Sequence, residues 1–315
     1  MKMLVTSFDR NPERLAALAQ QHGVEFVVPP RDQPTAPLMG DVDAVFGQLK
    51  ADEFANGKQL RWVQSSSAGV EWMWEVPGIA ESDVVVTNMR GAHAATIAEH
   101  AFAMLLCHTR GLRAFEQRQL DHAWRGAELS LSGIKGLTMG IVGFGNIGRA
   151  IARRATGFEM RVLAVDIEPG PPGEGVEEVW PLARLNDLCA AADVLAISAP
   201  ITPGSRGMIG QEQLRKLKRG SHLLVMSRGK IVNEAALVDA LEEGHLASAG
   251  LDVTATEPLP VGDPLWTAPN LIITPHRSAS SPLTSDLTWS ILAENIGRFL
   301  RGETLTNLVD KHRGW

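Results

Sequence analysis

A glycine-rich segment, Gly143-Phe-Gly145-Asn-Ile-Gly148, separates an apolar run at residues 138–142 from a helix-like stretch at residues 146–156. In a strand-to-helix turn the first glycine permits the tight turn, the second lets the backbone approach a pyrophosphate, and the third lets the helix pack closely on the strand. The N–H groups at the helix N-terminus then bind the phosphates. The segment therefore predicts a dinucleotide site that includes Gly143, Gly145, Asn146, Ile147 and Gly148.

Glycines at such a turn also have a purely structural explanation, so the following strand matters. Residues 161–165 form a strand-like run that ends at Asp166, 18 residues after Gly148. An acid at this distance accepts hydrogen bonds from the adenosine ribose hydroxyls of NAD. It would repel the 2′-phosphate of NADP, and the next residues, Ile167 and Glu168, supply no compensating base. The sequence favours NAD as cofactor, and the alternative is that Asp166 is a solvated loop acid.

Short apolar runs alternate with helix-like stretches along nearly the whole chain, which predicts an α/β protein with parallel sheets. The expected strands occupy residues 2–6, 25–28, 44–46, 61–64, 84–87, 138–142, 161–165, 194–198, 223–226, 247–251 and 271–274. The expected helices occupy residues 11–21, 94–120, 146–156, 283–300 and segments near 211–218 and 233–243, and residues 168–175 form a loop.

Composition restricts the class of protein and its partners. The 315 residues are 44% hydrophobic and carry a net charge of −6, which gives no general attraction for nucleic acid or anionic membranes. The longest unbroken apolar run, residues 101–107, is far shorter than the roughly 18 residues that span a bilayer. No signal peptide precedes the first strand, and the two cysteines, Cys107 and Cys189, lack metal-type spacing. We expect a cytoplasmic protein that binds neither nucleic acid nor a membrane and holds no metal.

Three polar side chains follow strand-like runs in the second half of the chain: Arg228, Glu257 and His276. An arginine suits a substrate carboxylate because its planar fork forms paired hydrogen bonds. A histidine suits proton transfer near neutral pH, and a neighbouring glutamate favours its charged form. Reduction of a 2-keto acid needs these groups. Each also has an ordinary explanation, namely a surface cation, a solvated turn acid and a loop histidine.

Four segments in this order, residues 143–148, 224–233, 250–260 and 274–276, resemble the D-isomer-specific 2-hydroxyacid dehydrogenase family. The resemblance extends from residue 65 to residue 310. It implies an NAD-dependent oxidoreductase that acts on CH–OH donors and moves hydride between NADH and C2 of a small 2-keto acid, with Arg228, Glu257 and His276 as catalytic residues.

The resemblance also assigns binding residues. Ala68 and Gly69 match the loop whose backbone N–H groups hold the substrate carboxylate. The positions that match cofactor-lining residues are Thr96, Pro200, Thr202, Ser227 and Asp252, the last near the nicotinamide amide.

The fold implied by the resemblance is two Rossmann-like domains, with the cofactor domain inserted into the substrate domain. We expect residues 1–98 and 285–315 to form the substrate-binding domain and residues 99–284 the NAD-binding domain. Family members are usually homodimers joined largely through their cofactor domains.

The chain departs from the family pattern at a few positions. Val225 replaces a common Asn, Thr254-Ala255 replaces a pair that often contains Phe, and Arg277 follows His276 where an aliphatic residue is common. Arg277 has two expected roles: it lowers the proton affinity of His276, or it binds a second substrate anion. These departures leave the reaction class in place and the identity of the keto acid open.

Other residues fit packing as well as function. Trp72 and Trp74 follow the carboxylate loop and either wall the substrate pocket or pack in a core or interface. His100 and His108 lie two turns apart on one expected helix, which favours contacts with other side chains over metal binding. An alternative to the enzyme is an NAD(H)-sensing interaction protein, like the corepressors that share this fold.

Overall fold

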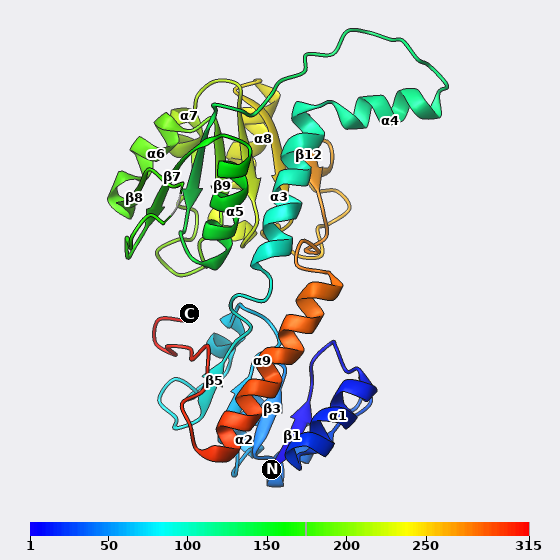
Figure 1. The fold of residues 1–315 in the computed structure, drawn as a ribbon, viewed down its shortest axis with the longest axis vertical. Coiled ribbons are helices and arrows are strands. Elements are labelled where there is room, and N and C mark those ends of the chain that lie inside the picture. The colour runs from blue at the N-terminus through cyan, green and yellow to red at the C-terminus, as the bar shows by residue number, and fades with distance from the viewer. Residues whose placement is uncertain (174, 315) are drawn as a thin grey trace. The chain divides into compact units, whose positions relative to one another are not determined.

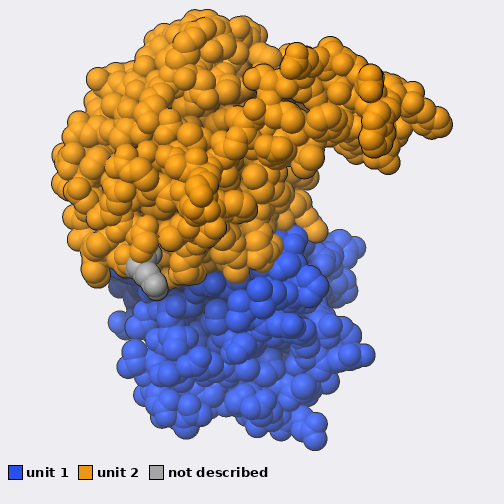
Figure 2. Space-filling view, turned by 45° about the horizontal axis from the view of Figure 1, so that its top comes forward, with its two compact units in different colours: residues 1–93, 280–315 blue, residues 94–279 orange. Residues whose placement is uncertain are grey.

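The structure is a computed structural model that describes residues 1–173 and 175–314. Glu174, in the loop expected over 168–175, and Trp315, at the end of the expected substrate domain, lie outside the described residues. The chain forms two compact units: unit 1 comprises Met1–His93 and Ser280–Trp315, and unit 2 comprises Ala94–Ala279 (Figure 2). Unit 2 is therefore inserted into the sequence of unit 1. Both expected limits, after residues 98 and 284, lie five residues beyond those of the units.

Unit 1 contains a parallel sheet in the strand order β2-β1-β3-β4-β5 (Figure 1). Its strands are β1 (Lys2–Val5), β2 (Glu25–Val27), β3 (Ala44–Phe46), β4 (Trp62–Gln64) and β5 (Val85–Thr87). Its helices are α1 (Pro12–His22), α2 (Ala51–Asn56) and α9 (Pro282–Arg301), with 3-10 turns η1 (Ala36–Asp41) and η2 (Glu71–Glu75). Apolar side chains of α1 and α9 pack on one face of the sheet, and those of η1 and η2 on the other.

Unit 2 contains a parallel sheet in the order β12-β11-β10-β9-β6-β7-β8. Its strands are β6 (Thr138–Val142), β7 (Arg161–Asp166), β8 (Glu178–Pro181), β9 (Val194–Ile197), β10 (Ser221–Val225), β11 (Leu246–Leu251) and β12 (Leu271–Ile273). Its helices are α3 (Ala94–Thr109), α4 (Leu112–Leu120), α5 (Asn146–Gly157), α6 (Leu185–Ala191), α7 (Gln211–Lys216) and α8 (Glu234–Glu242), with turns η3 (Leu182–Arg184), η4 (Gly229–Ile231) and η5 (Pro264–Trp266).

The sheet of unit 2 is covered on both faces. Helices α3 and α5 pack on one face, and α6, α7 and α8 pack on the other. From β6 the chain continues to β7 on one side, while the strand on its other side is β9. The strand order therefore reverses between β6 and β9, and in open α/β sheets ligands bind at the carboxyl ends of the strands beside such a point.

Most expected elements are present, with one correction and several omissions. The helix expected over residues 94–120 is two helices, because the chain breaks at Gly111, where φ is +64°. The sequence patterns did not predict α2, α6 or β8, which are short, and β8 lies at the sheet edge. Within the described residues, none of the helices combines the length and the apolar character needed to cross a bilayer.

Candidate active site

The glycine loop between β6 and α5 combines close packing with an open backbone. A Cβ on Gly143, where φ is +88°, would lie 2.5 Å from the backbone nitrogen of Ala199, and one on Gly148 would lie 2.3 Å from the carbonyl oxygen of Gly143. A Cβ on Gly145 would meet no described atom within 4 Å. Packing therefore requires two of the glycines, whereas Gly145 leaves the backbone accessible to a ligand.

Helix α5 begins directly at this open backbone. Gly145 precedes the helix and provides no side-chain cap for it. The N–H groups of Asn146, Ile147 and Gly148 belong to the first turn, where no partner exists within a helix. They fit the pyrophosphate of a dinucleotide, as the sequence predicts.

Asp166 ends β7 and is bound to the glycine loop. Its Oδ2 accepts the backbone N–H of Phe144 at 2.6 Å, and its Oδ1 accepts that of Glu168 at 3.0 Å. A carboxylate oxygen accepts two hydrogen bonds, so each oxygen keeps capacity for a ribose hydroxyl. The explanation as a solvated loop acid is therefore incomplete, because Asp166 also fixes the turn in which the phosphates would lie.

The other expected cofactor residues of unit 2 follow its strands or begin α3. Pro200 and Thr202 form a turn after β9, in which the Ser205 hydroxyl donates to the carbonyl of Pro200 at 2.8 Å. Thr96 lies in the first turn of α3. The hydroxyl of Ser227, after β10, is buried and has no hydrogen-bond partner in the described part of the chain. Since buried polar atoms are normally paired, this hydroxyl fits a site that a polar ligand completes.

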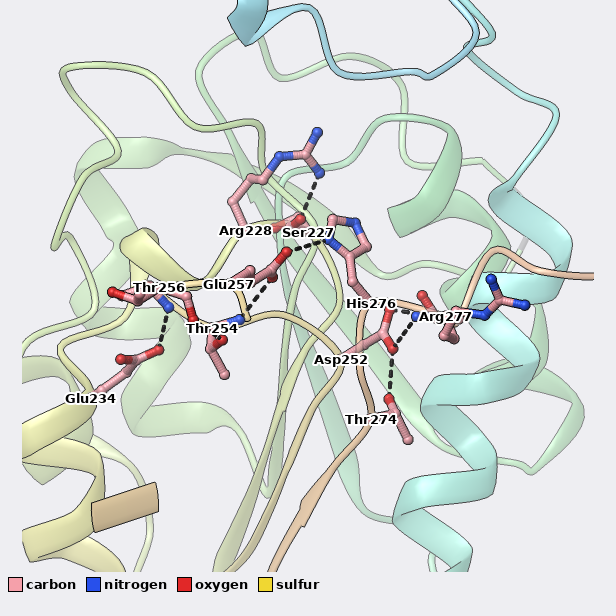
Figure 3. A network of polar contacts seen from close by, with 12 residues as sticks. Ser227, Arg228, Glu234, Asp252, Thr254, Thr256, Glu257, Thr274, His276 and Arg277 are labelled. Atoms are coloured by element: carbon pink, nitrogen blue, oxygen red, sulfur yellow. Dashed lines mark hydrogen bonds and ion pairs between the residues drawn. The ribbon is translucent and has the colours of Figure 1, made fainter. Parts of the chain in front are cut away.

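Arg228, Glu257 and His276 lie at the same end of the unit 2 sheet, after the carboxyl ends of its strands (Figure 3). Nδ1 of His276 lies 2.8 Å from Oε2 of Glu257, while Oε1 of Glu257 accepts the N–H of Thr254 at 3.1 Å. The imidazole remains 46% exposed. An ionised carboxylate only accepts hydrogen bonds, so Nδ1 carries a proton and Nε2 is left to act on a ligand. The Arg228 guanidinium donates to the carbonyl of Ser227 at 2.8 Å.

Two residues that sequence reasoning missed support Glu257. Oε1 of Glu234 accepts the N–H of Ala255 at 2.6 Å, which fixes the turn that carries Glu257. The pKa of the Glu234 carboxyl is raised, mainly by burial and further by the charges of Asp263 and Glu257. The hydrogen bond from Ala255 acts in the opposite direction and does not cancel the increase. The available signal was the position of Glu234 directly after Asn233, the N-cap of α8.

Gly229 is the second missed residue. A Cβ at this position would lie 2.1 Å from the carbonyl carbon of Thr254 and 2.5 Å from the nitrogen of Ala255. Glycine therefore lets the segment after Arg228 pack directly on the turn that carries Glu257. Its place in the Ser-Arg-Gly motif was the signal for this contact.

Asp252 is almost fully buried and organises the backbone around His276. Its carboxylate accepts the Thr274 hydroxyl at 2.6 Å and the N–H groups of Arg277 at 2.9 Å and Ser278 at 3.0 Å. The N–H of His276 donates to the carbonyl of Asp252 at 2.8 Å. His276 adopts φ +52°, an uncommon conformation for a side-chain-bearing residue, and these bonds hold it there.

Ala68 and Gly69 lie in unit 1, in the loop that follows β4. Among the described residues, no acceptor takes a hydrogen bond from their backbone N–H groups. The Asn88 side chain donates to the carbonyl of Ala68 at 2.8 Å, and the Ser67 hydroxyl donates to that of Gly69 at 2.7 Å. The loop thus has fixed carbonyls and available N–H groups, which suits an anion.

The residues whose roles the sequence left open differ in exposure. Trp72 is buried in the core of unit 1, whereas Trp74 is half exposed. The guanidinium of Arg277 lies away from the imidazole of His276 (Figure 3). This placement does not bring the Arg277 cation to His276.

Comparison with known proteins assigns the relationship. Residues 102–278 match the family model for the NAD binding domain of D-isomer specific 2-hydroxyacid dehydrogenases. A glyoxylate reductase from Korarchaeum cryptofilum is 36% identical over 90% of this chain and 87% of its own length. A D-3-phosphoglycerate dehydrogenase from Mycobacterium bovis is 33% identical over 95% of this chain, which spans only 57% of that longer protein.

Solved structures agree with this relationship. A D-isomer specific 2-hydroxyacid dehydrogenase family protein from Aeromonas salmonicida has a TM-score of 0.87 and 31% identity, covering 98% of this chain and 99% of its own. A glyoxylate/hydroxypyruvate reductase from Sinorhizobium meliloti, described as NADPH-dependent and solved with NADP and sulfate, has a TM-score of 0.85 and 28% identity, covering 100% and 99%.

Proposed function

The chain belongs to the D-isomer specific 2-hydroxyacid dehydrogenase family, and from this premise we propose that it is an NADH-dependent reductase of a small 2-keto acid. The matched model is that of an NAD binding domain, and the relatives are named dehydrogenases and reductases, consistent with an oxidoreductase that acts on CH–OH groups. The observation that carries the proposal is the pairing of Nδ1 of His276 with Glu257, which leaves Nε2 of the imidazole to act as a proton donor. Relatives named glyoxylate reductase and glycerate dehydrogenase support a substrate of two or three carbons.

Each proposed catalytic group has a distinct task. The bound cofactor supplies the hydride that C2 of the keto acid receives. His276 donates a proton from Nε2 to the carbonyl oxygen, and the Glu257 carboxylate stabilises the imidazolium before the transfer. Arg228 holds the substrate carboxylate through paired hydrogen bonds, which orients C2. In the reverse direction neutral His276 accepts the proton of the hydroxyl group.

We propose that NADH is preferred over NADPH. Asp166 keeps a carboxylate at the expected ribose position, and both Ile167 and Glu168 beside it are exposed and lack a positive charge. A 2′-phosphate would meet this carboxylate, and neither of the two residues that follow it supplies a cation. The Sinorhizobium meliloti relative is described as NADPH-dependent, so family membership alone leaves this preference open.

We propose that unit 2 binds the cofactor and that the loop of Ala68 and Gly69 in unit 1 contributes to substrate binding. The available N–H groups of Ala68 and Gly69 support substrate binding by unit 1, and the glycine loop supports cofactor binding by unit 2.

We propose a cytoplasmic location. Both cysteines, Cys107 and Cys189, are free thiols, which fits a compartment where thiols stay reduced.

We also propose a homodimer that forms through an arm of unit 2, defined as α4 and residues 121–133. The arm stands away from the rest of the unit (Figure 1) and exposes apolar side chains at Leu112, Phe115, Leu120, Trp124 and Leu131. Trp124 is 97% exposed. Such a cluster is typical of a protein interface.

Light scattering tests the proposed dimer. We expect a dimer mass for the protein and a lower mass for the double variant Leu120→Glu with Trp124→Ser. A monomeric parent protein would contradict the proposal.

The deciding experiment is a substrate panel. Purified protein with NADH is offered glyoxylate, hydroxypyruvate, pyruvate, and branched and aromatic 2-keto acids, and NADH consumption is followed. We expect turnover with at least one short acid, and almost none with His276→Ala, which should still bind NADH. NADH binding without turnover on any acid would refute the proposal and favour the NAD(H)-sensing alternative.

A further inference from the structure

A chain of side-chain contacts connects Asp252 with His100 on α3. The Thr274 hydroxyl lies 2.6 Å from Oδ1 of Asp252 and 2.9 Å from Nε2 of His100. Nε2 of His100 is itself 3.9 Å from the same carboxylate oxygen. All three residues belong to unit 2, and α3 packs on β10 and β11 beneath them.

The direction of these hydrogen bonds follows from the number of protons. A threonine hydroxyl has one hydrogen, and an ionised carboxylate only accepts, so Thr274 donates to Asp252. The hydroxyl oxygen then accepts from His100, which requires a proton on Nε2 of the imidazole. His100 is therefore a donor at the start of a chain that ends on Asp252.

Asp252 has almost no acceptor capacity to spare. A carboxylate has about four acceptor positions, and Thr274, Arg277 and Ser278 occupy three of them. One position remains on this carboxylate, whose side chain is fully buried in the structure; the family resemblance expects the nicotinamide amide near it. The same contacts hold His276 at φ +52°, a conformation that persists only where its surroundings determine it.

We propose that His100 is a positioning residue that acts through Thr274 and Asp252 on both the cofactor and His276. The proposal rests on the proposed NADH-dependent reduction and deepens it. Without the Nε2–H of His100, the Thr274 hydroxyl loses the donor that directs it and becomes free to rotate away from Oδ1. Asp252 then loses a partner on the side that supports the turn at His276. None of these three side chains has a proposed role in binding the keto acid, so the affinity for the keto acid should change little.

The test compares His100→Gln, which keeps an N–H donor near the position of Nε2, with His100→Leu, which does not. Thr274→Ser and Thr274→Val form a second pair that keeps or removes the hydroxyl. His108→Leu is the matched control, because it removes another imidazole from the same helix. Nε2 of His108 contacts the carbonyl of Ala249 and takes no part in the chain from His100 to Asp252. For each protein the Kd of NADH is measured by fluorescence titration, together with kcat, the KM of the keto acid and thermal stability.

We expect His100→Leu and Thr274→Val each to weaken NADH binding and lower kcat by roughly tenfold, the effect of about one hydrogen bond to a charged group. The KM of the keto acid should stay within about twofold, and His100→Gln and Thr274→Ser should recover most of the loss. The double variant His100→Leu with Thr274→Val should be no worse than either single one, since both break the same chain.

The opposite results would overturn the proposal. One such result is an unchanged NADH Kd in both His100→Leu and Thr274→Val. Another is a His100→Gln variant that binds NADH as weakly as His100→Leu, and a third is an equal loss of NADH affinity in His108→Leu. If His100→Leu does not fold, the Thr274 pair decides. If the parent protein reduces no keto acid, the proposed function fails, while the NADH Kd values still decide the role of His100.

Discussion

Nδ1 of His276 lies within hydrogen-bond distance of Oε2 of Glu257, at 2.8 Å, and this contact leaves Nε2 as the nitrogen that we propose meets the substrate. Glu257 is itself fixed through Oε1 by the N–H of Thr254. The proposed proton donor is thus oriented by a carboxylate that the backbone holds in place.

Glu257→Gln removes the charge beside His276 and keeps a hydrogen-bonding group. The carboxylate only accepts a hydrogen bond from Nδ1 of His276 and so leaves Nε2 for the substrate, whereas an amide can also turn its NH2 group toward Nδ1. We therefore expect kcat/KM for reduction to fall about tenfold or more while NADH affinity is retained. Steady-state kinetics and an NADH titration check this, and parental kinetics in Glu257→Gln would contradict the assignment.

Arg228→Lys keeps the positive charge and loses the planar fork. If Arg228 holds the substrate carboxylate with paired hydrogen bonds, we expect kcat/KM to fall about tenfold or more while NADH affinity is retained. Steady-state kinetics and an NADH titration check this. Parental kinetics in this variant would mean that Arg228 does not hold the reacting molecule.

Asp166→Ala with Ile167→Arg should narrow the gap between NADH and NADPH, because it removes a repelling carboxylate and adds a cation. Asp166→Asn with Ile167→Arg is the matched variant, since its amide oxygen can still accept the N–H of Phe144. We expect the Asn variant to retain more activity with either cofactor. The comparison is of kcat/KM values, and a parent enzyme that uses NADPH as well as NADH would refute the stated preference.

Gly229→Ala introduces a Cβ that would lie 2.1 Å from the backbone of Thr254. We expect destabilisation by about 1–3 kcal/mol and a loss of kcat/KM, because the turn that carries Glu257 must shift. Gly262→Ala is the control, as a Cβ there meets no described atom within 4 Å. Denaturant unfolding and kinetics of both variants decide; equal, small effects would mean that this contact is not required.

His222 should make the protein sensitive to acid. Burial, with the nearby His108 charge, lowers the pKa of His222 to about 4, against about 6.5 in an unfolded chain. Between these two pH values the unfolded state binds a proton that the folded state does not, so the free energy of unfolding falls by up to about 3 kcal/mol as pH decreases.

His222→Asn removes this titration and keeps a partner for the Ser248 hydroxyl, which lies 2.8 Å from Nδ1 of His222. We expect the variant to lose less stability than the parent between pH 7 and 4.5, as measured by calorimetry. Exposed His312→Asn should behave like the parent. A parental pH dependence in His222→Asn would contradict this explanation.

Local patterns predicted much of the fold. The apolar runs predicted eleven of the described strands, all except β8, to within a few residues. Asn11, the first residue of the helix expected over residues 11–21, caps α1, and its side chain accepts the N–H of Arg14. The break at Gly111 was missed, because periodicity does not reveal a single left-handed residue within an apolar pattern.

The site was predictable in its reactive residues and less so in their support. Motifs predict Arg228, Glu257 and His276, and the structure places these three side chains at the same end of the unit 2 sheet. The supporting contacts of Glu234 and His100 join positions 21 and 174 residues apart, and only the folded chain brings such positions together. The requirement for glycine at position 229 was not predictable either, because it depends on how close the backbone of Thr254 lies in the folded chain.

The hydrogen bond between Asp166 and the N–H of Phe144 has an evolutionary consequence. The carboxylate proposed to select the cofactor also shapes the loop that would receive its phosphates. A mutation that discards Asp166 therefore alters selectivity and loosens the loop at once. A lineage that changes from one dinucleotide to the other would pass most easily through an asparagine, which keeps the acceptor for Phe144 while the repelling charge is lost.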